Sequence, residues 1–331
     1  MRKTFLAAFA VFAFQISAAP AAAQYSVRRT PDLVQLEDAA NRVVVAIAPP
    51  AGNLTREMIV KGRNILGPLG IPFLAPWANR LDEQAFYANG TRYAFDMALG
   101  NVRGAHPIHG FLGAANWEVV EAKADAGAAW VTSRLEFFRQ PDWMAQFPFA
   151  HTMEMTHRLQ DGALEIAIRI HNLAAVPMPV AVGFHPYFQI ADAPRDAWTI
   201  ALGVRTEWVL APDKIPTGET RPIAQRFPGP ARALLKDHDL DHVFGDLIRD
   251  GSGRAVMSVA GTSQKIDVVF GPNYRAAVVY APKGRDFICF EPMAGITDAL
   301  NLAQRGLYTE LQHIPPGGTW EERFWVRPSG F

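Results

Sequence analysis

Glu291 lies in the segment Arg285–Asn301, RDFICFEPMAGITDALN, at a position suited to acid–base chemistry. It follows a short apolar run, Phe287–Phe290, that predicts a buried strand. The next residue, Pro292, supplies no N–H and favours extended geometry before it, so we predict that the strand ends at Glu291. A carboxylate held at a strand end is rigid and partly desolvated, which suits a general base. The pattern also fits a surface glutamate that closes a strand.

His185 is a second candidate proton carrier, in the segment Gly183–Phe188, GFHPYF. It lies among aromatic residues at a predicted strand end and is again restrained by a following proline, Pro186. Aromatic side chains suit the apolar C–H face of a pyranose, and a partly buried imidazole suits proton transfer near neutral pH. With ordinary pKa values of about 4.3 and about 6.5, Glu291 would be ionised while His185 could supply a proton. A structural, hydrogen-bonded histidine is the alternative interpretation.

Three further segments carry polar groups beside apolar or glycine residues. The pair Asn79-Arg80 offers a guanidinium that could hold sugar hydroxyls or a phosphate, or that could simply be a surface arginine. His106 and His109 lie three apart on a turn-like stretch, and because no third ligand has a recognisable spacing, we predict no metal site there. Asp241, in LDHVF, could bind sugar hydroxyls in pairs, or it could be a turn aspartate.

The elements that must position these residues are short strands. From Tyr25 onward the sequence shows extended runs separated by turn residues and hardly any sustained helical period. Asn89-Gly90 and Asp161-Gly162 predict two-residue hairpin turns. Many strands at short spacing indicate a sandwich or stacked-sheet architecture. The predicted strands are Arg42–Ala48, Tyr93–Phe95, Trp117–Glu121, Trp130–Phe138, Phe149–Leu159, Ala163–Ile170, Thr199–Leu202, Ala255–Val259, Lys265–Phe270, Ala276–Tyr280, Phe287–Phe290, Tyr308–Ile314 and Thr319–Val326.

The chain is predicted to fold as one domain after removal of an N-terminal signal peptide. Arg2 and Lys3 precede an apolar run, Phe5–Ile16, and an alanine-rich exit. This pattern predicts a signal peptide over residues 1–23 and a periplasmic or secreted domain over residues 24–331, with no membrane association after cleavage. The Pro- and Gly-rich stretch Arg205–Leu235 is interpreted as a long excursion within that domain.

Composition excludes several classes of protein. Of the 331 residues, 49% are hydrophobic and 19% are charged, as in an ordinary folded protein. The net charge is 0, and loss of the two basic residues of the leader makes it −2, so with no basic cluster we expect no nucleic-acid partner. Cys289 is the single cysteine, so no intramolecular disulfide can form. The common nucleotide-binding, zinc-protease, dithiol and serine-hydrolase motifs are absent.

Together these segments resemble the aldose 1-epimerase (mutarotase) family over most of the chain, from about Val34 to Val326. The matching residues, in the family's usual order, are the Asn79-Arg80 pair, His109 before Gly110, His185 in HPYF, Asp241 near Phe244, and Glu291 in an E-P-x-x-G-x-x-D-A-x-N segment. The HPYF and Glu-Pro segments are fairly specific. Two departures are Phe111, where a second glycine is familiar, and Met293, where relatives often carry an aromatic residue. They bear on sugar preference more than on proton chemistry.

The resemblance implies an all-β β-supersandwich of the galactose mutarotase type, with mostly antiparallel strands and few short helices. It implies that Glu291 accepts and His185 donates protons, while Asn79, Arg80, His109 and Asp241 bind the sugar. The implied activity is interconversion of the α and β anomers of free aldoses by ring opening and reclosure. No metal or other cofactor is implied, and the expected partner is a small sugar.

Three other functions are compatible with parts of the pattern. A hexose-6-phosphate 1-epimerase would share both specific segments but would need extra cations at the far end of the sugar, and an exported protein would not meet cytosolic hexose phosphates. A non-catalytic carbohydrate-binding protein on the same fold would bind sugar without turnover. A glycosidase or lyase needs two carboxylates, and pairing Glu291 with Asp241 would leave His185 without a role.

Overall fold

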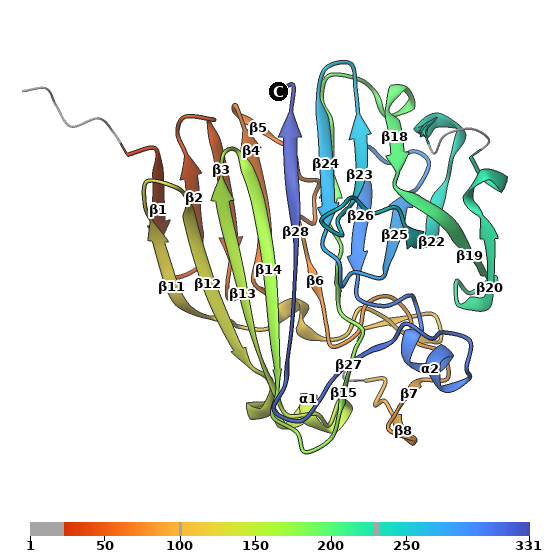
Figure 1. Cartoon of the computed structure of the whole chain (residues 1–331). Coiled ribbons are helices and arrows are strands. Elements are labelled where there is room, and N and C mark those ends of the chain that lie inside the picture. The colour runs from red at the N-terminus through yellow and green to blue at the C-terminus, as the bar shows by residue number, and fades with distance from the viewer. Residues whose placement is uncertain (1–22, 99–100, 228–231) are drawn as a thin grey trace, which may run out of the picture.

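The computed structural model describes residues 23–98, 101–227 and 232–331. The predicted signal peptide, residues 1–23, lies outside the described residues apart from Ala23. The strands form three large sheets, in which the named strands pair antiparallel, together with three small two-stranded ones (Figure 1). The described chain contains no helix that is both long and apolar enough to span a membrane.

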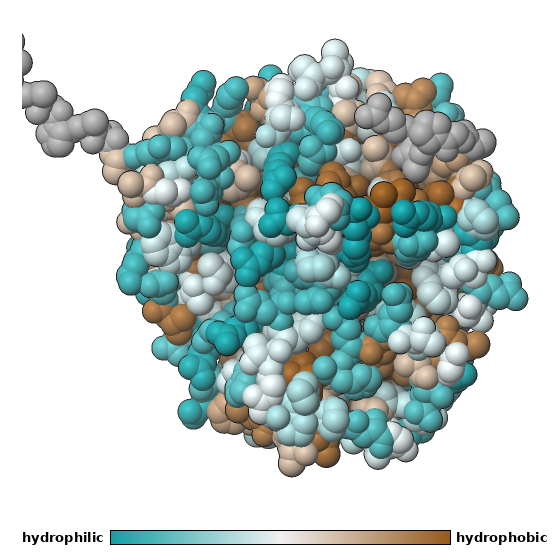
Figure 2. All heavy atoms as spheres, viewed as in Figure 1, coloured by the Kyte–Doolittle hydropathy of each residue, from teal (hydrophilic) through white to brown (hydrophobic). Residues whose placement is uncertain are grey.

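A nine-stranded sheet runs through the whole molecule. Along β12 the burial alternates residue by residue, so one face packs inward while the other meets solvent. The face of the molecule seen in Figure 2 is mostly hydrophilic, with its hydrophobic residues in small groups. In spatial order the strands are β11 (Glu118–Ala124), β12 (Ala129–Glu136), β13 (His151–Gln160), β14 (Ala163–Asn172), β28 (Thr319–Ser329), β24 (Lys265–Phe270), β23 (Ala255–Ala260), β18 (Thr199–Leu202) and β21 (Arg232–Leu234).

Two further sheets cover the inner face of this long sheet. The five-stranded sheet packs on its β11–β13 end through β1 and β2, and the eight-stranded sheet faces its other half, where the rings of Phe184 and Phe324 lie 4.9 Å apart. The architecture is therefore a β-supersandwich. The five strands are β1 (Tyr25–Arg29), β2 (Val34–Asp38), β3 (Val43–Ala48), β4 (Leu54–Val60) and β5 (Arg63–Asn64). The eight are β20 (Pro216–Pro222), β19 (Val204–Leu210), β22 (Leu240–Leu247), β25 (Ala276–Ala281), β26 (Ile288–Met293), β16 (Gly183–Phe184), β6 (Phe73–Leu74) and β17 (Tyr187–Phe188), the last pairing with β26.

The remaining elements are short and lie in the connections. Helix α2 and the β7–β8 hairpin lie together beside the eight-stranded sheet, at the lower right of Figure 1. The short strands are β7 (Ala85–Ala88), β8 (Thr91–Ala94), β9 (Val102–Arg103), β10 (His106–Pro107), β15 (Met178–Val180) and β27 (Gln312–Ile314). The helices are α1 (Pro141–Gln146) and α2 (Ala299–Gln304), with 3₁₀ turns at Leu112–Ala114, Phe137–Arg139, Arg195–Ala197, Ile223–Gln225 and Leu235–Asp237.

The strands and both hairpin turns predicted from sequence are present, with shifted ends and two corrections. Asn89-Gly90 and Asp161-Gly162 all have positive φ, as a two-residue hairpin turn requires. The predicted excursion Arg205–Leu235 is wrong, because most of β19 and all of β20 and β21 lie within it. β20 is an edge strand, where its prolines cost no ladder bond. The predicted strand Tyr308–Ile314 shrinks to β27, because Tyr308 packs in an apolar cluster that includes α2 residues instead of pairing.

Candidate active site

The candidate site lies on the outer face of the eight-stranded sheet. Along β26, Phe290 is buried in the main core between the sheets, and alternation directs the next side chain, Glu291, to the opposite face. Val278 of β25 lies opposite Glu291 and belongs to a separate apolar cluster on this outer face. Glu291 therefore lies beside an apolar cluster on a face that the sandwich core does not fill.

The pairing of β17 with β26 brings the two predicted proton carriers together. Tyr187 lies opposite Cys289, and counting two residues further along each antiparallel strand places His185 opposite Glu291. The pairing of β16 with β26 keeps the same register. Residues opposite each other in this way share a face of the sheet. The His185 Nε2 atom lies 3.3 Å from Glu291 Oε1.

The strand that carries Glu291 does not end there, which corrects the prediction from sequence. β26 continues through Pro292 to Met293, and Pro292 lies opposite Ala277 of β25. On the other edge of β26 the ladder is interrupted at His185 and Pro186, between β16 and β17. A proline is tolerated within a strand where its nitrogen is not needed as a ladder donor, so β26 continues past Pro292.

All six predicted site residues line one cleft of about 510 Å³. They come from distant segments of the chain: two loops, the β16–β17 connection, β22 and β26. They are Asn79, Arg80, His109, His185, Asp241 and Glu291. The other lining residues, which sequence reasoning did not select as site residues, are Asn101, Val102, Arg103, Ile108, Tyr187 and Tyr280.

Asn79 and His109 hold each other at the wall of the cleft. Both have left-handed backbone geometry, with φ of 59° and 61°. The Asn79 N–H donates to His109 Nδ1 at 3.2 Å, and the His109 N–H donates to the Asn79 carbonyl at 3.0 Å. Since Nδ1 accepts, the proton of neutral His109 is on Nε2. Burial, and then Arg80 and Arg103, lower the pKa of His109 to about 4, so the ring is neutral at pH 7.

A steric constraint explains why the residue after His109 is a glycine. Gly110 has φ of +59° and pairs with Ala75 across an isolated bridge. A Cβ at this position would collide with the Ala75 carbonyl group. Only glycine allows both the left-handed geometry and this close approach, and the approach holds the loop that carries His109 against the sheet.

Arg80 and Asp241 approach the cleft from different sides. The Arg80 Nη1 atom donates to Asn79 Oδ1 at 3.1 Å, which anchors the guanidinium beside the loop. Asp241 of β22 lies opposite Tyr280 of β25, which in turn lies opposite Cys289 of β26. These residues form a single row across the sheet, adjacent to the row of Glu291 and His185. Lys214 Nζ is 3.8 Å from Asp241 Oδ2 and offsets its charge.

Burial moves the pKa values of His185 and Glu291 in opposite directions. Burial, with a smaller contribution from His109, lowers the pKa of His185 to about 3. Burial also raises the pKa of Glu291 well above its usual range, with Asp241 adding to the rise and Arg80 opposing it. The ordinary pKa values expected from sequence are therefore wrong for this pair. Burial favours neutral His185 beside protonated Glu291.

Aromatic rings fix the imidazole, and the Tyr187 hydroxyl lies 3.5 Å from His185 Nε2, the atom that also faces Glu291. The rings of Tyr187 and His185 stack with centroids 4.5 Å apart, and the ring of Tyr280 meets the imidazole edge-on at 5.9 Å. Glu291 Oε2 is buried without a hydrogen-bond partner among residues 23–98, 101–227 and 232–331. A buried polar atom of this kind is suited to a ligand hydroxyl. In the same described ranges, no group of three or more His, Cys, Asp or Glu side chains could hold a metal ion.

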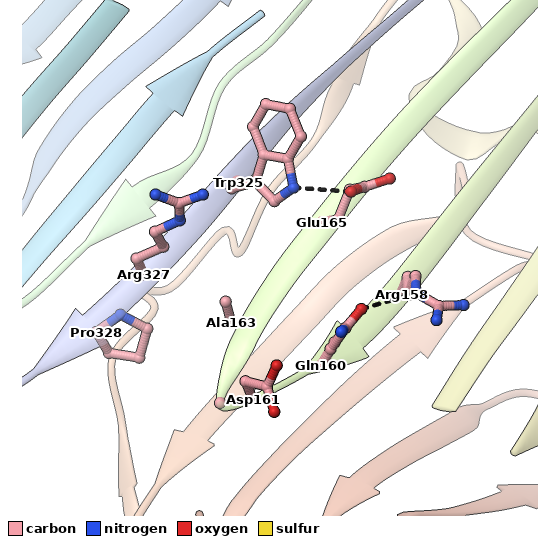
Figure 3. Close-up of a pocket in the computed structure, with 9 residues that line it drawn as sticks. Arg158, Gln160, Asp161, Ala163, Glu165, Trp325, Arg327 and Pro328 are labelled. Carbon is pink, nitrogen blue, oxygen red and sulfur yellow. Dashed lines mark hydrogen bonds between the residues drawn. The ribbon is translucent and has the colours of Figure 1, made fainter. Parts of the chain in front are cut away.

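A second cavity, of about 400 Å³, lies on the outer face of the nine-stranded sheet (Figure 3). It is lined by residues of the β13–β14 hairpin and of β28. The Trp325 indole N–H donates to Glu165 at 2.7 Å, and Arg158 donates to Gln160 at 3.3 Å. None of the predicted site residues lies there. These two hydrogen bonds join cross-strand or same-strand neighbours, as on an ordinary solvent-facing sheet.

The sequence over residues 44–327 matches the family model described as aldose 1-epimerase. The chain belongs to the aldose 1-epimerase family. This family comprises carbohydrate epimerases that act on small sugars, which agrees with a cleft that joins a buried histidine–glutamate pair to hydrogen-bonding side chains.

Several individual proteins are similar to this aldose 1-epimerase family member. The uncharacterised protein YihR of Escherichia coli (strain K12) is 29% identical over 115 residues, which cover 34% of each chain. The match thus spans about a third of that relative. A galactose mutarotase-like protein from Clostridium acetobutylicum is 19% identical in sequence, with a TM-score of 0.80 and coverage of 93% of this chain and 98% of that one. A galactose 1-epimerase from Lactobacillus acidophilus NCFM is 15% identical, with a TM-score of 0.72 and coverage of 93% and 98%. These likenesses confirm the predicted fold.

The lining residues that the sequence did not reveal differ in how they could have been found. Tyr187 is two residues after His185, so alternation alone places both on one face of the sheet. Tyr280 is the last residue of a predicted strand. Asn101 and Arg103 carry no local signal, because only the closure of the loop against Gly110 brings them to the cleft. The Asn101 side chain donates to the Gly110 carbonyl at 2.9 Å.

Proposed function

We propose that this member of the family is an aldose 1-epimerase that interconverts the α and β anomers of an aldose, with Glu291 and His185 as its acid–base pair. The observation that carries the proposal is the placement of the two side chains opposite each other, 3.3 Å apart, in a polar cleft. Glu291 is 1% exposed and His185 is 8% exposed, so proton transfer takes place at the bottom of the cleft.

The reaction needs one proton moved from O1 and one delivered to the ring oxygen O5. In the proposed mechanism the Glu291 carboxylate takes the O1 proton while the His185 imidazolium protonates O5, and the C1–O5 bond breaks. The open-chain aldehyde then faces protonated Glu291 and neutral His185, which is the form that burial favours. Rotation about C1–C2 and reclosure with the roles reversed give the other anomer.

The pair holds a single proton in both halves of this cycle. It is either an ion pair or a neutral pair, so it carries no net charge at any stage, which limits the free-energy cost of its burial. Hydroxyl groups of the bound sugar that donate to Glu291 stabilise the carboxylate and prepare it for ring opening. Acid–base catalysis of this kind is worth about 10²- to 10⁴-fold in rate, ample for a reaction that already occurs slowly in water.

The remaining polar residues are assigned to sugar binding. Arg80 and the His109 Nε2–H group offer donors to sugar hydroxyls, and Asp241 offers an acceptor. Asn79 positions both Arg80 and His109. Tyr280 adds an aromatic edge beside the imidazole, suited to the C–H groups of a pyranose. The substrate is then held by groups that do not transfer protons.

Polarimetry tests this function directly. Freshly dissolved α-glucose and α-galactose are followed with purified mature protein, and we expect equilibration much faster than in buffer. Isothermal titration calorimetry on the same samples measures binding. Sugar binding by folded protein without faster equilibration would replace the proposal with a carbohydrate-binding function on the same fold.

We also propose that the protein is exported, with cleavage near Ala23. The support is the sequence pattern of residues 1–23. Mass spectrometry of the protein recovered from the periplasm or medium should find a chain that begins just after the alanine-rich exit. Retention of Met1 in the mature protein would contradict this proposal.

A further inference from the structure

We propose that the aldose taken by this cleft carries an anionic substituent, such as the carboxylate of a uronic acid, which Arg103 binds together with Arg80. The inference rests on the proposed function and names the class of its substrate. Arg103 belongs to β9 and was not among the site residues expected from sequence.

The first support is the two guanidinium groups that line the cleft. Arg80 donates to the uncharged side chain of Asn79. Within the described ranges, neither Arg80 nor Arg103 forms an ion pair with an Asp or Glu side chain. Both guanidinium groups line the same concave site, with Arg80 half-buried and Arg103 exposed at the rim. A planar guanidinium offers a pair of parallel N–H donors that match the two oxygens of an anionic group.

The second support is the charge balance of the cleft. Two carboxyl groups line it, Asp241 and Glu291. The ammonium group of Lys214 lies 3.8 Å from Asp241 and offsets its charge. Burial raises the pKa of Glu291 and favours its uncharged form. The two guanidinium charges are therefore not cancelled by the acidic groups of the site, and the cleft carries excess positive charge that attracts an anion.

The positive field extends across the cleft to His109. After burial, Arg80 and Arg103 are the charges that lower the pKa of this ring. An uncharged sugar hydroxyl gains little from such a field, because it can be held by any neutral donor. An anionic group gains charge-assisted hydrogen bonds, which are roughly twice as strong as neutral ones.

The third support is the depth at which each group lies. Glu291 and His185 are almost fully buried, so the anomeric carbon is at the bottom of the cleft. Arg103 is exposed at the rim. A sugar with C1 at the bottom directs its far end outward, and an anionic substituent at that end reaches the rim.

The hairpin that carries Arg103 is fixed in place. Arg103 pairs with His106 across β9 and β10, and His106 Nδ1 lies 3.1 Å from the Leu81 carbonyl oxygen. His106 Nε2 is 3.4 Å from Asp213 in the β19–β20 hairpin. These contacts fix the β9–β10 hairpin on both sides, so the backbone at Arg103 has a defined place at the rim of the cleft.

The test compares charged and neutral aldoses in the same mutarotation assay. Glucuronate and galacturonate supply a carboxylate, glucose 6-phosphate supplies a phosphate, and glucose and galactose are the neutral references. We expect kcat/KM for the preferred anionic sugar to exceed that for its neutral counterpart by about tenfold, and high salt to reduce the difference. The best substrate among the charged sugars identifies the anionic group.

Variants of Arg103 separate recognition of charge from general damage. Arg103→Gln should lower the ratio of anionic to neutral kcat/KM by roughly tenfold, while Arg103→Lys should keep part of it. Arg29→Gln is the matched control, since Arg29 is an exposed arginine on β1, far from the cleft, and its loss changes the net charge equally. Equal losses for charged and neutral sugars in Arg103→Gln would overturn the inference, as would a wild-type preference for neutral sugars.

The same experiment distinguishes failure of the inference from failure of the proposed function. Rapid turnover of neutral sugars without a preference for charged ones leaves the epimerase activity in place and removes the inference. If no sugar is turned over, calorimetric titration with glucuronate and glucose still tests whether the cleft binds an anionic group. Tighter glucuronate binding that Arg103→Gln abolishes supports the anionic site, and equal or absent binding of the two sugars overturns it.

Discussion

His185 lies opposite Glu291 across the interrupted edge of β26, with Nε2 3.3 Å from Oε1. The two strands supply the alignment, and the prolines that follow each residue, Pro186 and Pro292, remove backbone donors on either side of the pair. A titratable pair is thus placed where the sheet has no ladder of its own to maintain. This relationship supports the proposed proton chemistry and leads to the predictions that follow.

Glu291→Gln should abolish most of the activity. The substitution keeps the size of the side chain and much of its hydrogen bonding but removes the base, so mutarotation should slow by about two or more powers of ten. Polarimetry with α-glucose measures the effect, and circular dichroism confirms that the variant is folded. A folded variant with nearly wild-type rates would contradict the acid–base role and favour a binding protein.

His185→Asn should cause comparable damage, because the ring can no longer protonate O5. The double variant Glu291→Gln/His185→Asn should be little slower than either single variant, since the two groups act as one unit. The same polarimetric assay, run on all three proteins at matched concentration, gives the comparison. Multiplied losses in the double variant would show that the two residues contribute independently.

The dependence of rate on pH should reflect the shifted pKa values. With ordinary values, protonated His185 would be lost above about pH 6.5 and the rate would fall. The structure predicts otherwise: burial lowers the pKa of His185 to about 3 and raises that of Glu291 well above its usual range, so the pair keeps one shared proton over a wider pH range than ordinary values allow. The enzymatic rate, corrected for buffer, should therefore show no fall centred near the ordinary histidine pKa of about 6.5. A decline centred near the ordinary histidine pKa would contradict this shared proton.

Arg80→Ala and Asp241→Ala should mainly raise KM. Both side chains line the cleft, and their charges act on Glu291 in opposite directions, so we expect each to contribute mainly to sugar binding. Initial rates over a range of sugar concentrations separate KM from kcat. A collapse of kcat at unchanged KM would show that these residues act in the transition state.

His157 should make the protein less stable in acid. Burial lowers the pKa of this ring to about 3, while the unfolded chain has an ordinary histidine, so the unfolded state binds one more proton between these pKa values. Stability from the neutral ring is complete at neutral pH and is lost as pH falls below about 6.5, by about 1.4 kcal/mol per pH unit at most. His157→Gln should therefore lose less stability than the wild type between about pH 6 and pH 4. Urea unfolding of both proteins measures the free energies, and parallel pH dependences would contradict the assignment.

Local patterns predicted much of the fold because they reflect local physics. The alternation in Ala163–Ile170 and the Asp161-Gly162 turn depend only on neighbouring residues, and both are present in the β13–β14 hairpin. The edge strand β20 escaped prediction because its Pro- and Gly-rich sequence resembles a loop, and only pairing with β19 makes it a strand. The predicted strand end before Pro292 was wrong for the same reason, because the effect of a proline on a strand depends on the neighbouring strand.

The sequence by itself determined which residues could transfer protons and which segments would be strands, because side-chain chemistry, alternation and turn preferences are local properties. Only the tertiary structure decided that His185 faces Glu291, that Arg103 joins the cleft, and that burial moves the pKa values of the acid–base pair apart. Register across strands and desolvation both depend on segments far apart in the chain. No short stretch of sequence contains that information.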